Sequence, residues 1–187
     1  MAMPATQIRR GMVIVFEGQP CRVLEFRHHT QGNLRAMIQT KMKNLRNGNS
    51  FEHRFRAADT IERASMETHE LEFMYQGGDT WHFMNTVNFD QLEMDEEMLG
   101  DNAQWMQSGM KILAEYYDGR PIGIELPQFL VLEVVDTAPV MKTATKTAST
   151  KPAKLDNGVM INVPEFVATG EKVRVNPNTG EYMDRAK

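Results

Sequence analysis

The sequence predicts an all-β protein made of three small β-barrels in series. Short apolar and β-branched runs recur along the chain, turns rich in glycine and asparagine separate them, and only one stretch has a helical pattern. Many short strands of this kind favour closed barrels, because closure removes the exposed edges of a small sheet. We divide the chain at Arg63, where the composition changes, and at Pro127, which gives segments 1–63, 64–127 and 128–187.

Segment 1–63 is expected to form one small barrel of four or five strands. Phe51, His53 and Phe55 alternate with polar residues, which is typical of a half-buried strand. Gly32 and Asn33 both tolerate a positive φ, so the chain can reverse there and form a projecting hairpin. We place the strands of this segment at residues 12–16, 21–26, 36–43 and 50–56.

The other two segments have the pattern of related barrels of the oligonucleotide-binding type. A glycine-rich turn at 76–79 joins two strands of a hairpin, and a helix is expected at 94–106, with Met94, Met98, Leu99 and Trp105 on its apolar side. The polar stretch 142–151 could be a linker, but its place inside the third segment favours a long barrel loop. We place the remaining strands at residues 70–75, 80–84, 109–117, 122–126, 129–135, 158–163, 172–175 and 182–183.

Charge is distributed unevenly along the chain, although its net value is only −4. Segment 1–63 has eleven lysines and arginines against five acids, a net of +6, and segment 64–127 has two against thirteen, a net of −11. The last segment has eight against seven, a net of +1. A basic block beside an acidic one indicates a polyanion binder that docks in one orientation, although segment charge also fluctuates without function.

The sequence contains no pattern that indicates an enzyme, a cofactor site or a membrane protein. It has no P-loop, nucleophile elbow or HExxH motif, and no apolar run long enough to span a bilayer. His28 and His29 are adjacent in an extended segment and point apart, so we expect them to face RNA rather than to hold a metal. The single cysteine, Cys21, is expected in the core, and with no signal peptide the protein is expected in the cytoplasm.

Two features of the sequence favour RNA binding. The first is the hairpin tip, which could instead be an ordinary exposed loop, and the second is the hydroxyl-rich loop of the third segment. The tip comprises His29, Thr30, Gln31, Gly32, Asn33, Leu34 and Arg35. The cations that we expect to contact phosphates are Arg27, Lys41, Lys43 and Arg46 beside the tip, and Lys142, Lys146 and Lys151 in the loop.

The chain resembles bacterial elongation factor P over almost its whole length. Ordered matches at compatible spacing occur in all three segments, which makes the resemblance specific, and they support the boundaries at 63 and 127. The first segment has the stretches GQP at 18–20, RVLEF at 22–26 and KMKNL at 41–45. The others have YQGGD at 75–79, PIGIELP at 121–127, TKPA at 150–153, VPEF at 163–166 and GEYMDR at 180–185.

The resemblance implies an SH3-like, KOW-type first barrel, two oligonucleotide-binding barrels and an L-shaped outline that imitates tRNA. It implies a monomeric translation factor that binds ribosomal RNA and the P-site tRNA, and that promotes peptide-bond formation where consecutive prolines stall the ribosome. The hairpin tip would face the peptidyl-tRNA, and Tyr182 and Arg185 join the residues expected to bind RNA. No small-molecule substrate, membrane or cofactor is implied, and the ribosome remains the catalyst.

The sequence departs from the family at two places. Family members commonly have a modifiable lysine, or in one branch an arginine, at the tip position where this chain has Asn33, so we expect no lysine-type modification. The third-segment loop has Thr143, Ala144 and Thr145 where relatives commonly have Gly-Asp-Thr. The alternative is therefore a paralogue that binds ribosomes or structured RNA without acting on proline stalls.

Overall fold

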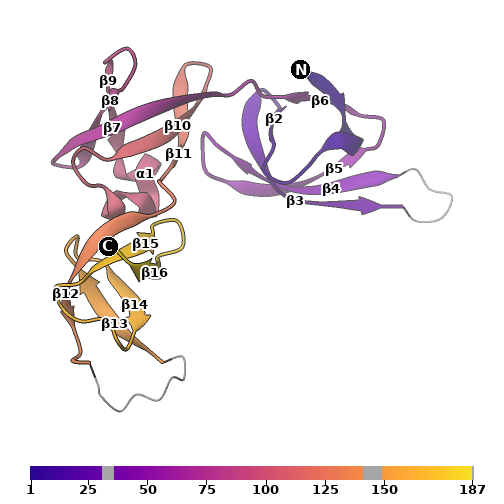
Figure 1. Ribbon diagram of the computed structural model, residues 1–187. Helices are drawn as coiled ribbons and strands as arrows, with labels where there is room; N and C mark the ends of the chain where they lie inside the picture. Colours follow the sequence, from indigo (N-terminus) through magenta and orange to yellow (C-terminus); the bar gives the residue numbers. More distant parts are fainter. Residues whose placement is uncertain (31–35, 141–148, 187) are drawn as a thin grey trace. The chain divides into compact units, whose positions relative to one another are not determined.

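The computed structural model describes residues 1–30, 36–140 and 149–186 (Figure 1). Strands β1 to β16 form three sheets, one after another along the sequence, and each sheet is curled. The described residues pack into two compact units, 1–69 with 114–123, and 70–113 with 124–187. The three-segment division at residues 63 and 127 therefore stays a prediction. No helix in the described part of the chain is long and apolar enough to cross a membrane.

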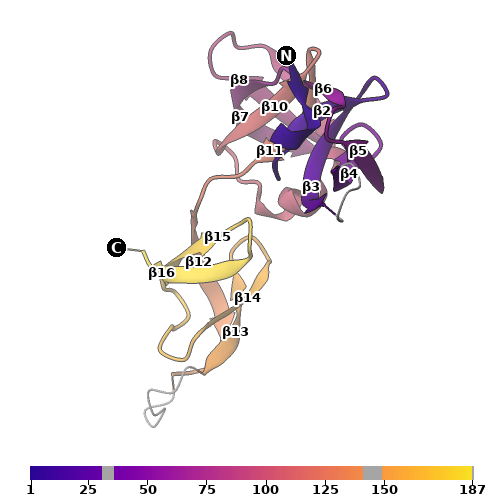
Figure 2. The ribbon, with the colours of Figure 1, turned by 90° about the vertical axis from the view of Figure 1, so that its right-hand side faces the viewer.

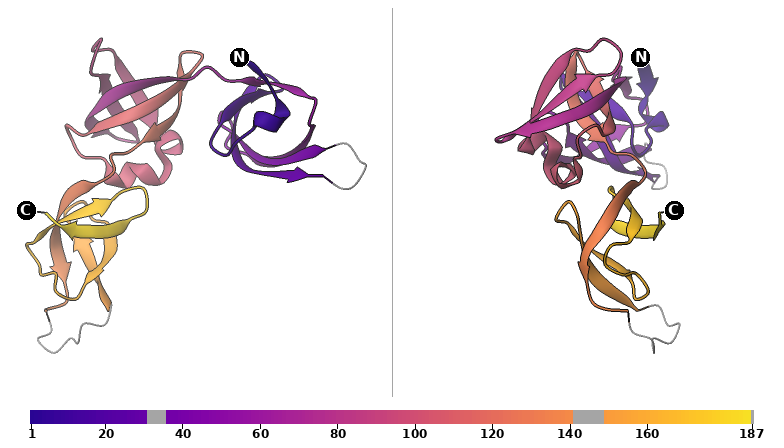
Figure 3. Two further views of the ribbon diagram at one scale, coloured as in Figure 1. Left: turned by 45° about the vertical axis from the view of Figure 1, so that its right-hand side comes forward. Right: turned by 60° about the vertical axis from the view of Figure 1, so that its left-hand side comes forward.

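The first sheet curls around an apolar core (Figure 3, left). Its buried side chains include Ile14, Val23, Ile38 and Met42, and along β4 the buried residues alternate with more exposed ones. The strand order is β1-β6-β2-β3-β4-β5. The strands are β1 (Ala2–Pro4), β2 (Val13–Phe16), β3 (Gln19–His29), β4 (Met37–Asn44), β5 (Ser50–Arg56) and β6 (Thr60–Arg63).

The four strands that we predicted in this segment are present, and the two that we did not predict are the short strands β1 and β6. These two strands pair with each other, with Met3 opposite Ile61. Each spans four residues or fewer, too short for an alternating pattern to stand out from the sequence. Strand β6 also pairs with β2, which places it inside the sheet.

The second sheet has the order β11-β10-β7-β8-β9. Its strands are β7 (Glu67–Gly77), β8 (Thr80–Asn85), β9 (Gln91–Asp95), β10 (Lys111–Tyr117) and β11 (Arg120–Glu125). Leu71, Phe73 and Phe83 are buried inside it, with the Phe73 and Phe83 ring centroids 5.4 Å apart. The glycine turn of the first hairpin follows β7, as we predicted.

The helix predicted at 94–106 is wrong for most of its length. Met94 belongs to strand β9, and only α1 (Glu96–Leu99) is α-helical, followed by the 3₁₀ helix η2 (Gly100–Trp105). Gly100 has φ +54°, a left-handed conformation that ends the α-helix after one turn. Met94, Leu99 and Trp105 are buried as predicted, but a strand, a turn of helix and a 3₁₀ segment bury them instead of one helix, and Met98 is exposed.

The third sheet has the order β14-β13-β12-β15-β16 (Figure 2). Its strands are β12 (Leu130–Thr137), β13 (Thr150–Leu155), β14 (Met160–Pro164), β15 (Lys172–Asn176) and β16 (Glu181–Arg185). Strand β13 was not predicted, because its alternating residues Lys151, Ala153 and Leu155 follow a threonine- and lysine-rich stretch. Alternation buries all three of them on the core side.

Candidate nucleic-acid interface

The outward face of strands β3, β4 and β5 contains five exposed cations of the first sheet. Cross-strand pairing places Arg27 opposite Gln39, and Gln39 opposite Arg54, so these side chains lie in one row across the face. The next rows have Lys41 between Glu25 and Glu52, and Met37 beside Arg56. We call this surface the basic face; its cations are Arg27, Lys41, Lys43, Arg54 and Arg56, and all five are exposed.

Three of these five cations were predicted from the sequence, and two were not. Arg54 and Arg56 lie far from the tip in sequence, but the register of β4 and β5 brings them beside Gln39 and Met37. The available signal was the alternation of β5, since Phe51, His53 and Phe55 point inward and the residues between them must point outward. Arg46, the other predicted cation, is exposed in the turn after β4, outside the rows of the basic face.

Strands β3 and β4 lead toward the predicted hairpin tip. His29 is the last residue of β3 and pairs with Met37, and Thr30 follows it; both His29 and Thr30 are exposed. The rest of the predicted tip, Gln31 to Arg35, lies outside the described residues. Arg27 is two residues before His29 on β3, so the basic face continues along the hairpin toward the tip.

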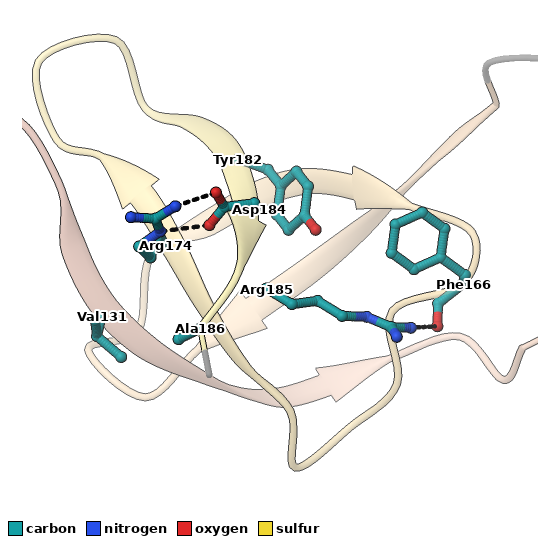
Figure 4. Close-up of a pocket in the computed structure, with 7 residues that line it drawn as sticks. All are labelled: Val131, Phe166, Arg174, Tyr182, Asp184, Arg185 and Ala186. Carbon is teal, nitrogen blue, oxygen red and sulfur yellow. Dashed lines mark hydrogen bonds and ion pairs between the residues drawn. The ribbon is translucent and has the colours of Figure 1, made fainter.

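A groove on the outward face of β12, β15 and β16 contains the two other residues that we expected to bind RNA, Tyr182 and Arg185 (Figure 4). Arg185 lies over the Phe166 ring, with its Cζ 4.6 Å from the ring centroid, and donates a 3.0 Å hydrogen bond to the Phe166 carbonyl oxygen. Its Nε is 3.3 Å from a Glu171 carboxylate oxygen. Burial raises the pKa of Tyr182 above its ordinary value.

The loop lysines of the third segment do not form one exposed cluster in the described structure. Lys142 and Lys146 lie outside the described residues. Lys151 is buried, with 4% of its surface exposed, and its Nζ donates a 2.5 Å hydrogen bond to the Ala138 carbonyl oxygen. In this position the Lys151 ammonium does not face a phosphate, because strand alternation turns it inward; the geometry argues against our expectation that it binds RNA.

His28 and His29 lie exposed on strand β3, and Cys21 lies in the core of the first sheet. His28 and His29 are consecutive and exposed on β3, and the described residues contain no group of three potential ligands that could hold a metal ion. Cys21 is buried in the first core, and burial, with a smaller effect of Glu17, raises the pKa of its thiol. A protonated, buried thiol is a weak nucleophile.

Three sequence families match the chain in succession. Residues 4–61 match the family described as the elongation factor P KOW-like domain, and residues 66–124 match the elongation factor P OB domain. Residues 130–185 match the family described as elongation factor P, C-terminal. Among solved structures, eukaryotic translation initiation factor 5A from Methanococcus jannaschii covers 67% of this chain and 94% of its own, with a TM-score of 0.56 and 14% identity. That likeness shows the fold alone.

Two whole-length relatives agree with these matches. The chain is 75% identical over 187 residues to elongation factor P of Gemmatimonas aurantiaca, and the match covers 100% of both chains. It is 46% identical over 186 residues to elongation factor P of Acidobacterium capsulatum, again over 100% of both. The class of protein is therefore a translation elongation factor built from β-barrel domains. The chain belongs to the elongation factor P family, which confirms the predicted all-β fold and the resemblance found in the sequence.

Proposed function

We propose that this protein binds the ribosome beside the P-site tRNA and promotes peptide-bond formation where consecutive prolines stall translation. It would act in the cytoplasm as a monomer, without an enzymatic activity or cofactor of its own. The observation that carries the proposal is the basic face, which leads along β3 and β4 toward the predicted tip. Cations in rows can neutralise successive phosphates of an RNA strand, which fixes the position of the protein on the RNA.

Positioning accounts for how such a protein assists without an active site. Proline is a poor acceptor because its ring fixes φ and constrains the attacking nitrogen. A factor that holds the peptidyl-tRNA in a reactive geometry lowers the entropic part of the barrier, while the ribosome performs the chemistry. The proposal assigns Arg27, Lys41, Lys43, Arg54 and Arg56 to phosphate contacts, and residues 29–35 to the peptidyl-tRNA.

The proposed mechanism uses the tip without a lysine-type modification, because Asn33 lacks the amine that such a modification extends. Gly32 and Asn33 favour the turn, and Arg35 supplies the nearest cation. A reconstituted translation assay on a message with three consecutive prolines tests this, using protein whose intact mass matches the unmodified chain. We expect the wild-type protein to restore full-length product and Arg35→Ala to restore less.

The same assay distinguishes the proposed function from the alternative, a paralogue that does not act on proline stalls. Normal ribosome binding without any rescue by the wild-type protein would contradict the proposed function and favour a paralogue that binds ribosomes for another purpose. Gly32→Val is the matched test of the tip, since a β-branched residue disfavours the turn while the charge is unchanged. We expect Gly32→Val to bind ribosomes but to lose rescue.

A further inference from the structure

The groove on the third sheet is a second surface with the size of a ligand site. It is an open groove of about 860 Å³, lined by side chains of β12, β15 and β16 together with Phe166 (Figure 4). Small-molecule sites commonly enclose about 300–1,000 Å³. Oligonucleotide-binding barrels usually bind nucleic acid over their second and third strands, which here are β13 and β14. The groove therefore lies on a different face of the barrel.

Both arginines of the groove already have carboxylate partners. Arg174 makes a bidentate ion pair with Asp184, with a 2.5 Å hydrogen bond from its Nε, and Arg185 pairs with Glu171. Figure 4 shows the Arg174–Asp184 pair at one side of the Tyr182 ring and Arg185 bonded to the Phe166 carbonyl oxygen. A phosphate would have to compete with these carboxylates for each guanidinium. The groove is thus poorly suited to an anion.

Flat apolar surface is what the groove offers instead. Phe166 is 50% exposed although one face of its ring is under the Arg185 guanidinium. Tyr182 is half-buried and extends between the Arg174–Asp184 pair and Phe166. A guanidinium stacked on an aromatic ring forms a wide, rigid platform, and the paired arginines and carboxylates place donors and acceptors around it. These features fit a flat, uncharged ligand with hydrogen-bonding edges.

We propose that the groove binds an unpaired RNA nucleobase, stacked on Phe166 and Tyr182, with its polar edge bonded to the surrounding arginines and carboxylates. The proposal rests on the proposed function, since the ribosome and its tRNA supply the RNA. Every nucleobase has a π-face, so stacking on aromatic side chains tolerates any sequence. The groove would therefore recognise that a base is unpaired and not which base it is. The basic face would hold phosphates, and the groove would hold a base.

The test is an NMR titration of the full chain that follows the ring resonances of Phe166 and Tyr182. Adenosine, which has a base and no phosphate, is expected to shift both resonances, and ribose 5-phosphate, which has a phosphate and no base, is expected to leave them unchanged. Phe166→Ala should weaken adenosine binding about tenfold or more. Phe166→Tyr should restore it, because the ring is kept. Phe89→Ala is the control, since it removes another exposed ring, outside the groove.

Each outcome decides the proposal. Equal shifts with adenosine and ribose 5-phosphate would mean that the groove binds the ribose common to both, and no shift with adenosine would mean that no base binds; either result overturns the inference. A Phe166→Ala protein that binds adenosine as the wild type does would overturn it too. Ribosome pelleting and the triple-proline assay are run on the same wild-type protein. If they succeed while the titration fails, the inference is wrong and the proposed function stands; if they fail, the proposed function is wrong whatever adenosine does.

Discussion

Lys151 shows how strand alternation decides the role of a charged side chain. It lies between exposed neighbours on β13 and points inward, where its ammonium is bonded to the Ala138 carbonyl oxygen. Thr137 Oγ1 also bonds across to the Pro152 carbonyl oxygen at 2.9 Å, so the ends of β12 and β13 are joined by two side chains. Lys154, three residues on, is exposed. The two lysines have the same charge and opposite environments.

We expect Lys151→Ala to lower the free energy of unfolding by about 1–3 kcal/mol, because it removes a part-buried hydrogen bond and the packing of a buried side chain. Lys154→Ala makes the same charge change at an exposed site and should alter the free energy of unfolding by about 0.5 kcal/mol or less. Urea denaturation of both variants measures the difference. Equal stabilities would mean that burying the ammonium costs as much as its hydrogen bond contributes.

Asp184 gives the third sheet a pH-dependent contribution to stability. Its hydrogen bonds and charge interaction with Arg174 hold the pKa of the carboxyl below its usual range. A carboxyl whose pKa is lowered on folding stabilises the folded state above its unfolded pKa, about 3.9, and this contribution is lost as pH falls through the lowered value. Both side chains are partly exposed, so water screens the pair.

The expected result is that wild type is more stable than Asp184→Asn by a constant amount between about pH 7 and pH 5. The two unfolding free energies should converge as the pH falls from about 4 through the lowered pKa of the folded protein, because below it both proteins have a neutral side chain at this position. Urea denaturation across a pH series measures this. A difference that stays constant into acid would contradict the inferred ion pair.

The turn between β8 and β9 places a bulky residue, Phe89, in a backbone conformation that suits glycine or asparagine better. Phe89 has φ +62°, a left-handed conformation that is unfavourable for a bulky residue, and its side chain is exposed. The turn is held by backbone hydrogen bonds from Asn85 to Asp90 and from Phe89 to Asn85, at 2.8 and 3.0 Å. The hairpin therefore imposes the strained conformation, and the exposed phenylalanine ring buries little surface to offset the strain.

Phe89→Asn should raise the free energy of unfolding by about 1 kcal/mol, since asparagine tolerates this conformation. The control is Val87→Asn, which introduces the same side chain in the same turn at a residue without positive φ. Val87 is 82% exposed, so we expect a change of about 0.5 kcal/mol or less. Thermal denaturation of both variants tests the prediction. A destabilised Phe89→Asn protein would show that the ring packs against a surface that stabilises the turn.

The long, alternating strands could be predicted from the sequence, and the elements that depend on tertiary context could not. Strand β5 was predicted at its observed bounds because Phe51, His53 and Phe55 alternate clearly. The apolar residues at 94–106 have helical spacing, yet strand pairing at Met94 and the left-handed Gly100 overrode it. Part of the basic face was found because Arg27, Lys41 and Lys43 lie near the tip in sequence. Arg54 and Arg56 were missed because cross-strand register, which brings them there, is set by the whole sheet.

Charge along the whole molecule predicts which surface meets RNA. Segment 1–63 has a net charge of +6, the next segment −11 and the last +1, so phosphate attraction should be strongest at the first sheet. Each phosphate that the protein neutralises releases condensed counterions, so the affinity falls more steeply with added salt when more phosphates are bound. If ribosome binding uses the basic face, its salt dependence must change when cations are removed from that face and not when they are removed elsewhere.

The double variant Lys41→Ala, Lys43→Ala should weaken ribosome binding and reduce the slope of log affinity against log salt by about 1 to 2, roughly one for each phosphate that is no longer neutralised. The matched control is Lys154→Ala with Lys172→Ala, which removes two exposed lysines from the third sheet and makes the same change in net charge. Ribosome pelleting across a salt series measures both variants. An unchanged slope in the first variant would rule out Lys41 and Lys43 as phosphate ligands. An equal loss of affinity in the two double variants would mean that net charge alone draws the protein to the ribosome. A defined binding surface should instead make the loss depend on which cations are removed.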